Sequence, residues 1–205
     1  MNKHHHTRCA IALLALAAVA FPAAAQSSDF STWSAHGDVL SAGTLAQLTT
    51  AAVDSGETPL SAHSALLFDE LESRLGVYFE GDTYEGSAIT TSFAAAAGTR
   101  VALQWSFVTA DFDPLFADRA YAIIDGAPHW LVQADGGAQG GTFSHSFTLG
   151  GVHTLGFAVW DVNDVTGVST LGLSSLSVSA VPEPAGFALL LAGLGLVGGV
   201  AGRRR

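Results

Sequence analysis

The chain has 205 residues, a formal net charge of -10 and a single cysteine. Its 18 acidic residues outnumber the eight basic ones, and a surface this acidic repels phosphate backbones, which excludes nucleic acid as a partner. Because Cys9 is the only thiol, a disulfide framework and a thiolate metal centre are excluded as well.

Residues 1–25 predict a secretory signal peptide. Lys3 and Arg8 precede an apolar run at 10–21 that is too short to cross a bilayer. Ala23 and Ala25 then form a small-residue A-x-A cleavage site. We therefore expect export across the inner membrane and a mature chain that begins at residue 26.

Residues 26–180 predict one all-β domain. Val101, Leu103, Trp105 and Phe107 alternate with more polar neighbours, which is the period of a half-buried strand. Further short apolar runs, each closed by a Gly or Asp turn, recur about every 10–15 residues. This spacing favours an antiparallel β-sandwich, jelly-roll-like in its topology. The further runs lie at 88–97, 120–124, 130–133, 143–147, 155–159 and 171–178.

One segment of this domain predicts a helix. Leu67, Leu71 and Leu75 fall four residues apart, with Leu66 directly before the first of them. Ser64 would cap the first turn, and Gly76 would end the helix. Upstream, residues 49–59 predict a long loop.

Several short motifs of this domain resemble secreted bacterial β-sandwich domains of the carbohydrate-binding-module type. They are Gly37-Asp38-Val39, Trp105-Ser106-Phe107 and Asp118-Arg119-Ala120-Tyr121. The resemblance implies a jelly roll that binds a ligand at its surface, and it implies no particular substrate.

The last 24 residues divide into three parts. Pro182, Glu183 and Pro184 form a stiff extended stretch. The uncharged residues 185–202 are long enough to cross a bilayer as a helix, with Arg203, Arg204 and Arg205 left in the cytoplasm.

This arrangement resembles the PEP-CTERM sorting signal, and we expect it to occupy residues 181–205. The resemblance implies processing by an exosortase in a bacterium that makes exopolysaccharide. The protein would be anchored in the inner membrane before cleavage, and would lie at the cell surface or outside the cell after it. The alternative is a plain C-terminal anchor.

Aspartates follow two of the predicted strands and suggest a calcium site. Carboxylate oxygens are the ligands that Ca²⁺ prefers, and it tolerates irregular geometry. If the two loops meet at one edge of the sandwich, their oxygens would converge. The alternative is that these aspartates only form turns. The candidate ligands are Asp111, Asp113, Asp118, Asp161 and Asp164.

Among the tryptophans, Trp130 follows Pro128-His129 and is the candidate for an exposed, ligand-binding ring, whereas Trp105 and Trp160 are expected in the core. No nucleophile motif or zinc-type histidine pair is present. We therefore predict an exported, non-catalytic surface or matrix protein that binds glycan or calcium. The alternative is a secreted glycan-active hydrolase with an aspartate pair.

Overall fold

The computed structural model describes residues 29–79, 83–110, 113–179 and 192–193. The described strands all lie within one compact unit, residues 23–182. The predicted signal peptide, with Ala23 and Ala25, lies outside the described residues, as do the six predicted sorting residues at 182–184 and 203–205. Of the predicted membrane helix at 185–202, only the helical Ala192 and Gly193 are described.

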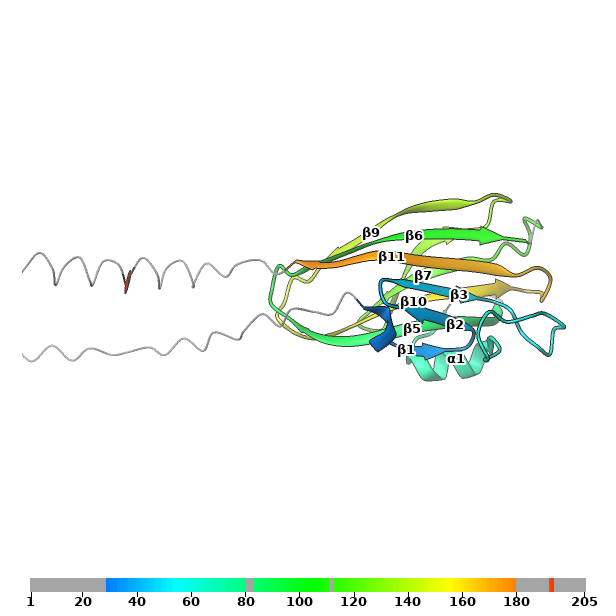
Figure 1. The fold of residues 1–205 in the computed structure, drawn as a ribbon, viewed down its shortest axis with the longest axis horizontal. Helices are drawn as coiled ribbons and strands as arrows, with labels where there is room; N and C mark the ends of the chain where they lie inside the picture. The colour runs from blue at the N-terminus through cyan, green and yellow to red at the C-terminus, as the bar shows by residue number, and fades with distance from the viewer. Residues whose placement is uncertain (1–28, 80–82, 111–112, 180–191, 194–205) are drawn as a thin grey trace, which may run out of the picture. The chain divides into compact units, whose positions relative to one another are not determined.

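The domain is an antiparallel β-sandwich, as the sequence predicts (Figure 1). Sheet A has six strands, of which five follow the order β1 (Ser34–His36), β5 (Thr83–Ala95), β10 (Gly151–Val162), β7 (Arg119–Ile124) and β8 (Ala127–Gln133). Its sixth strand, the two-residue β4 (Leu66–Leu67), also pairs with β5. Sheet B has the order β2 (Val39–Ala42), β3 (Leu45–Thr49), β11 (Ser169–Ser179), β6 (Arg100–Thr109) and β9 (Gln139–Ser146).

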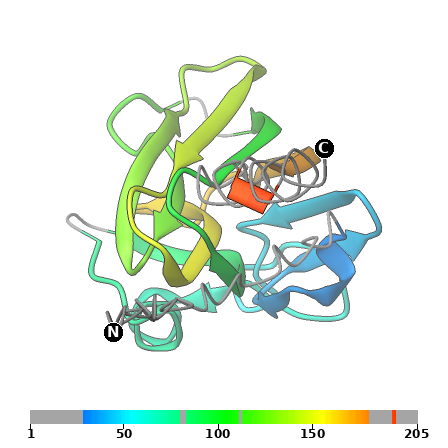
Figure 2. The same ribbon diagram turned by 90° about the vertical axis from the view of Figure 1, so that its left-hand side faces the viewer.

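The main core fills the space between the two sheets. Alternate residues of the long strands point inward, so that Phe107 and Leu171 of sheet B meet Phe157 and Ile89 of sheet A, and all four are fully buried. Figure 2 views this sandwich end-on, from the end where β11 finishes. Burial of this core stabilises the folded state by about 25 cal/mol per Å² of apolar surface removed from water.

A second, smaller core lies on the outer face of sheet A. The helix α1 (Phe68–Leu75) places Leu71 against Trp160, Tyr121 and Ala88 of the sheet. A short 3-10 helix, η1 (Phe30–Thr32), precedes the first strand. Among the described residues, α1 is the helix that packs on a sheet face, and it covers part of the outer face of sheet A.

The start of the helix differs from the prediction. Ser64 was expected at the N-cap, whereas α1 begins at Phe68 and Leu67 holds the N-cap position. Leu66 and Leu67 pair with Gly86 and Glu85 of β5 instead of forming a first helical turn. The Ser64 hydroxyl accepts a hydrogen bond from Val53 N, so it does not cap the helix. The predicted end is confirmed: Gly76 adopts the left-handed conformation, with φ of 62°.

Candidate functional site

A groove of about 230 Å³ lies on the outer face of sheet A, beside the C-terminal end of α1. Hydroxyl side chains from three neighbouring strands meet in it. Thr90 and Ser92 of β5 stand beside Gly156 and Thr154 of β10, because the register pairs these residues directly. The lining residues are Ser34, Arg74, Leu75, Thr90, Thr91, Ser92, Ile123, Gly126, Thr154, Leu155 and Gly156.

Gly156 keeps the floor of the groove open. A Cβ at this position would stand 3.0 Å from the Thr90 methyl group and 3.3 Å from the Ile89 carbonyl oxygen. Thr90 Oγ1 is held by a 3.2 Å hydrogen bond with His36 Nε2. Burial, with the nearby Arg74 charge, lowers the pKa of His36, so its ring is neutral at pH 7.

The groove is lined by hydroxyl, guanidinium and apolar groups. Among its lining residues there is no carboxylate, so it holds no acid–base pair for hydrolysis. Arg74 supplies a guanidinium at the rim, where it pairs with Glu70 at 2.5 Å. Ile123 and Leu155 add apolar surface. Such a site offers hydrogen bonds from its hydroxyl groups and contact from its apolar surface, and a sugar ring can make both kinds of interaction.

Trp130, the predicted ligand-binding ring, lies on the edge strand β8 and is 54% exposed. It does not line the groove. Tyr121 meets its ring edge-on at 5.4 Å, and the Arg119 guanidinium stands 5.3 Å from the ring centre. These contacts hold the indole in place while leaving much of it open to solvent. Of the other tryptophans, Trp160 is fully buried and Trp105 is partly buried against the main core.

The predicted aspartates separate into two kinds. Asp113 is exposed, and its Oδ1 accepts a hydrogen bond from Leu115 N at 2.9 Å. Asp164 does the same for Thr166 N at 3.3 Å. Both contacts are those of aspartates that stabilise turns. Asp111 lies outside the described residues.

Asp118 and Asp161 form a buried carboxyl pair. Each is 0% exposed, and they meet because Arg119 of β7 pairs with Trp160 of β10. Asp118 is well bonded: its Oδ2 accepts from the Ser169 hydroxyl at 2.5 Å, and its Oδ1 accepts from Val162 N at 3.2 Å.

Asp161 is the unusual member of this pair. Both of its carboxyl oxygens are buried and neither makes a hydrogen bond of good geometry, although the Asp118 carboxyl and the Thr50 hydroxyl lie beside it. Burial, followed by the charge of Asp118, raises the pKa of Asp161 to about 10. At neutral pH this shift favours the protonated, uncharged form of Asp161.

Two further carboxyl groups lie towards the same end of the sandwich. Burial raises the pKa of Glu85, which accepts a 2.8 Å hydrogen bond from the Ser55 hydroxyl. Burial also raises the pKa of Glu57, whose Oε2 accepts from Ala52 N. Even so, the described part of the chain contains no group of three or more acidic, histidine or cysteine side chains arranged to hold a metal ion.

The groove was not foreseen from the sequence. Most of its residues are ordinary Thr, Ser and Gly positions of β5 and β10, and the register of these two strands brings them together. The one available signal was Gly156 within an otherwise apolar strand, since such a glycine often marks close approach to the backbone.

No curated protein matches the sequence. Among solved structures, the chain is similar to TmCBM61 in complex with beta-1,4-galactotriose, at 11% identity and a TM-score of 0.37 over 75% of this chain and 92% of that one. It is also similar to the N-terminal cellulose-binding domain from Cellulomonas fimi beta-1,4-glucanase C, at 11% identity and a TM-score of 0.33 over 74% and 90%. At these TM-scores, the likeness assigns no ligand to this chain.

The sorting signal is supported by a comparison of its own. Residues 180–205 match the model of the PEP-CTERM protein-sorting motif. In the described segments, the structure has no helix with the length and apolar character needed to cross a membrane. The match covers the Pro-Glu-Pro stretch, the uncharged run and the arginine cluster together. This protein therefore carries a PEP-CTERM sorting motif, behind an antiparallel β-sandwich domain.

Proposed function

We propose that this protein is an exported, non-catalytic glycan-binding module. An exosortase would process it at the C-terminal motif, after which it would lie at the cell surface or in the exopolysaccharide matrix. The observation that carries the binding function is the groove on sheet A, which is lined by hydroxyl groups and lacks carboxylates among its lining residues. The sorting motif supports the proposed export and location.

The size and lining of the groove suit part of a polysaccharide chain. Its volume of about 230 Å³ is below the range of about 300–1,000 Å³ typical of pockets that enclose a whole small molecule. Ser92, Thr154 and Thr90 would exchange hydrogen bonds with sugar hydroxyls, and Ile123 would contact the apolar face of a ring. Trp130 on the same sheet face offers a stacking surface for a sugar outside the groove.

The test is binding of the full-length protein to a panel of neutral and acidic polysaccharides. The double variant Ser92→Ala/Thr154→Ala removes two hydroxyls from the groove. Its matched control, Ser106→Ala/Thr142→Ala, removes two exposed hydroxyls from the outer face of sheet B. Two lost hydrogen bonds, at about 1 kcal/mol each, should weaken binding more than tenfold in the first variant and leave the control unchanged. Equal loss in both would contradict the groove as the site.

A second proposal is that calcium stabilises the domain at the Asp118–Asp161 pair. The supporting observation is the buried carboxyl of Asp161, whose two oxygens make no hydrogen bond of good geometry although the Thr50 hydroxyl and the Asp118 carboxyl lie beside it. Asp118, Asp161 and the Thr50 hydroxyl would supply oxygen ligands, and Ca²⁺ accepts such groups together with backbone carbonyls. The bound charge would keep both carboxylates ionised and would take the place of the proton.

The alternative of a glycan-active hydrolase gains little support from this pair. A glycosidase needs two carboxyl groups that reach the bond to be cleaved. Asp118 and Asp161 are each 0% exposed, and neither lines the groove. The geometry therefore favours binding over hydrolysis.

A further inference from the structure

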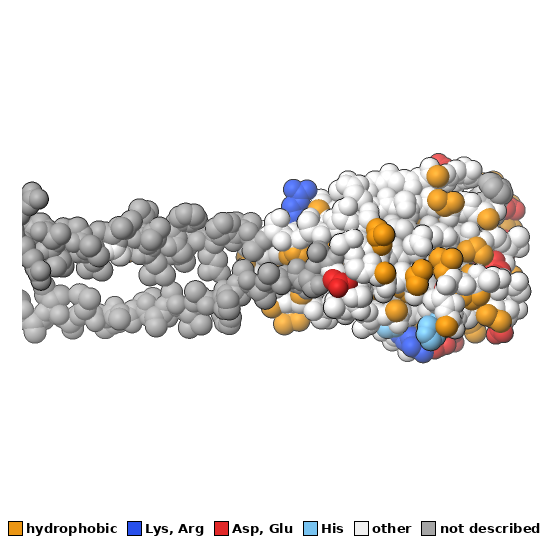
Figure 3. Space-filling view, viewed as in Figure 1, with side chains coloured by type: hydrophobic (Ala, Val, Ile, Leu, Met, Phe, Trp, Pro, Cys, Tyr) orange, Lys and Arg blue, Asp and Glu red, His pale blue; other side chains and the backbone are white. Residues whose placement is uncertain are grey.

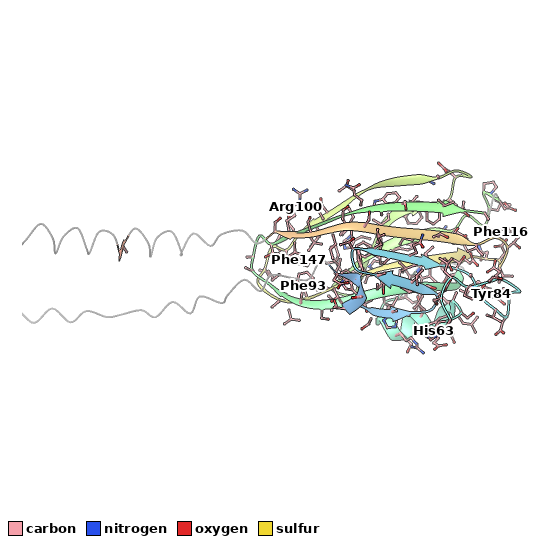
Figure 4. The ribbon with its side chains drawn as sticks, viewed as in Figure 1. His63, Tyr84, Phe93, Arg100, Phe116 and Phe147 are labelled. Atoms are coloured by element: carbon pink, nitrogen blue, oxygen red, sulfur yellow. The ribbon has the colours of Figure 1, made fainter. Side chains whose placement is uncertain are left out.

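The two ends of the sandwich differ in their side chains. We call the end formed by residues 94–100, 125–126, 147–152 and 177–179 the tail end, since β11 finishes there at Ser179. Ser179 pairs with Arg100, which in turn pairs with Ser146. Figure 4 labels Arg100, Phe93 and Phe147 at this end, and Phe116 and Tyr84 at the opposite one.

Two large apolar side chains project from the tail end. Leu149 is 73% exposed and Val152 is 77% exposed, and they flank the Gly150-Gly151 turn. The core at this end is instead formed by Phe147, which is buried and packs edge-on against Phe93 with the ring centres 5.4 Å apart. The side chains of Leu149 and Val152 therefore stand free of the domain.

The backbone beneath these side chains is firmly held. Gly98 N donates to the Phe147 carbonyl oxygen at 2.7 Å, and Phe147 N donates to the Thr99 carbonyl oxygen at 2.9 Å. His153 Nε2 contacts the Leu149 carbonyl oxygen at 3.1 Å. The turn thus presents Leu149 on a pre-ordered support, so little entropy is lost when that side chain binds.

The charge of the tail end also differs from that of the rest. Its only acidic residue is Asp125, which is paired with His153 at 2.8 Å, and its basic residue is Arg100. On the face shown in Figure 3, most acidic side chains lie at the other end. An anionic lipid surface would repel that other end, but not the tail end.

The chain itself brings the tail end to a membrane. Only residues 180–184 separate Ser179 from the uncharged run that begins at Ala185 within the sorting motif. Five residues span at most about 18 Å when fully extended. While the motif anchors the protein, the tail end cannot move further than this from the lipid surface.

We propose that the tail end is a membrane-docking surface. Leu149 and Val152 enter the boundary between headgroups and acyl chains, as the apolar side chains of interfacial segments do. Arg100 lies among anionic headgroups. The partner is a lipid surface, and docking holds while the C-terminal motif is in place. This inference rests on the sorting motif and is independent of glycan binding.

The test places an environment-sensitive fluorophore on the full-length protein, in vesicles of phosphatidylethanolamine and phosphatidylglycerol. Cys9→Ser removes the only cysteine, and Leu149→Cys introduces a single labelling site. The matched control is Leu115→Cys, equally exposed at 78% but in the loop before Asp118 at the other end. We expect a blue-shifted emission at 149, and quenching by spin-labelled lipid about twofold or more greater than at 115.

A second site and a charge variant keep the test decisive. Val152→Cys should behave like Leu149→Cys, and Arg100→Glu should reduce lipid quenching at both sites. Equal quenching at 149 and 115 would overturn the proposal. A blue shift at 149 without lipid quenching would also overturn it, because a second copy of the protein would then be covering the surface. Loss of glycan binding in the groove variants would leave all these results unchanged.

Discussion

The opposite ends of the sandwich show two ways of placing polar groups in a small domain. At the tail end, the one carboxylate, Asp125, is half exposed and paired with a histidine. At the other end, Asp118 and Asp161 are fully buried side by side, with Glu85 nearby. An exposed ion pair such as Asp125–His153 changes the free energy of folding little. Two buried carboxylates side by side destabilise the folded state unless a proton or a cation neutralises one of them. Side chains whose burial has such a cost are the stronger candidates for a ligand.

The largest difference between the ends should appear when a buried acceptor is removed. Asp118→Ala would leave the Val162 amide and the Ser169 hydroxyl without their partner inside the protein. We expect a loss of about 3 kcal/mol in the free energy of unfolding, measured by urea denaturation. The control Asp113→Ala removes an exposed carboxylate that accepts from Leu115 N, and it should cost less than about 1 kcal/mol. Similar losses in both variants would mean that the buried hydrogen bonds of Asp118 contribute no more to stability than an exposed turn contact does.

The calcium proposal predicts an effect of nearly the same size. Calcium at 100 times its dissociation constant would stabilise the folded state by about 2.7 kcal/mol. For a domain of this length, the melting temperature should rise by about 5–10 °C between EDTA and calcium. Asp161→Asn should abolish the rise, whereas Asp164→Asn, whose carboxyl only supports a turn, should retain it. An unchanged melt in calcium, with magnesium as control, would show that the pair shares a proton instead.

In the absence of calcium, the same pair should make stability depend on pH. The pKa of Asp161 is raised from 3.8 to about 10 by burial and by Asp118. The folded state therefore holds a proton that the unfolded state releases, and stability falls as pH rises between these values. The slope should approach about 1.4 kcal/mol per pH unit, measured by urea denaturation in EDTA between pH 5 and 7. Asp161→Asn should flatten this slope, and an equal slope in the variant would exclude Asp161 as its source.

Much of the fold was predictable because it follows from local patterns. Alternation marks β6 from Val101 to Phe107, and the glycine at 76 ends the helix where expected. The start of α1 was missed because Leu66 and Leu67 have the spacing of helical residues, yet they pair with β5. The local spacing of apolar residues gives no information about pairing with a strand some 20 residues away. The boundary of the helix was therefore set by a tertiary contact that the sequence pattern could not predict.

The candidate sites depend still more on long-range register. Asp118 and Asp161 were both singled out in the sequence, but their contact follows from the pairing of β7 with β10. The same counting of acidic residues also selected Asp113 and Asp164, whose Oδ1 atoms accept from backbone amides two residues further on. Sequence spacing therefore finds residues with suitable chemistry, and only register separates the buried carboxyls from turn formers.

The smallest predicted effect concerns the histidines of the tail end. His153, with its ring 4.3 Å from that of Phe147, donates from Nδ1 to the Asp125 carboxylate at 2.8 Å, and this hydrogen bond raises the pKa of His153. Burial, with the charge of His129, lowers the pKa of His145, whose ring centre lies 4.7 Å from that of Phe147.

The two shifts act on stability in opposite directions, so the pH dependence of the tail end should be weak. The contribution of His153 is present below pH 6.5 and is lost as pH rises through its folded pKa. The protonation of His145 opposes folding, so its effect is a loss of stability as pH falls through 6.5.

We expect NMR titration to place the pKa of His153 above 6.5 and that of His145 below it. Asp125→Asn should lower the pKa of His153 and cost about 0.5 kcal/mol at pH 6, since Asp125 is half exposed. If the two histidines titrate together near 6.5, the Asp125–His153 pair does not form in solution, and the tail end carries an unpaired carboxylate that would weaken its docking to lipid.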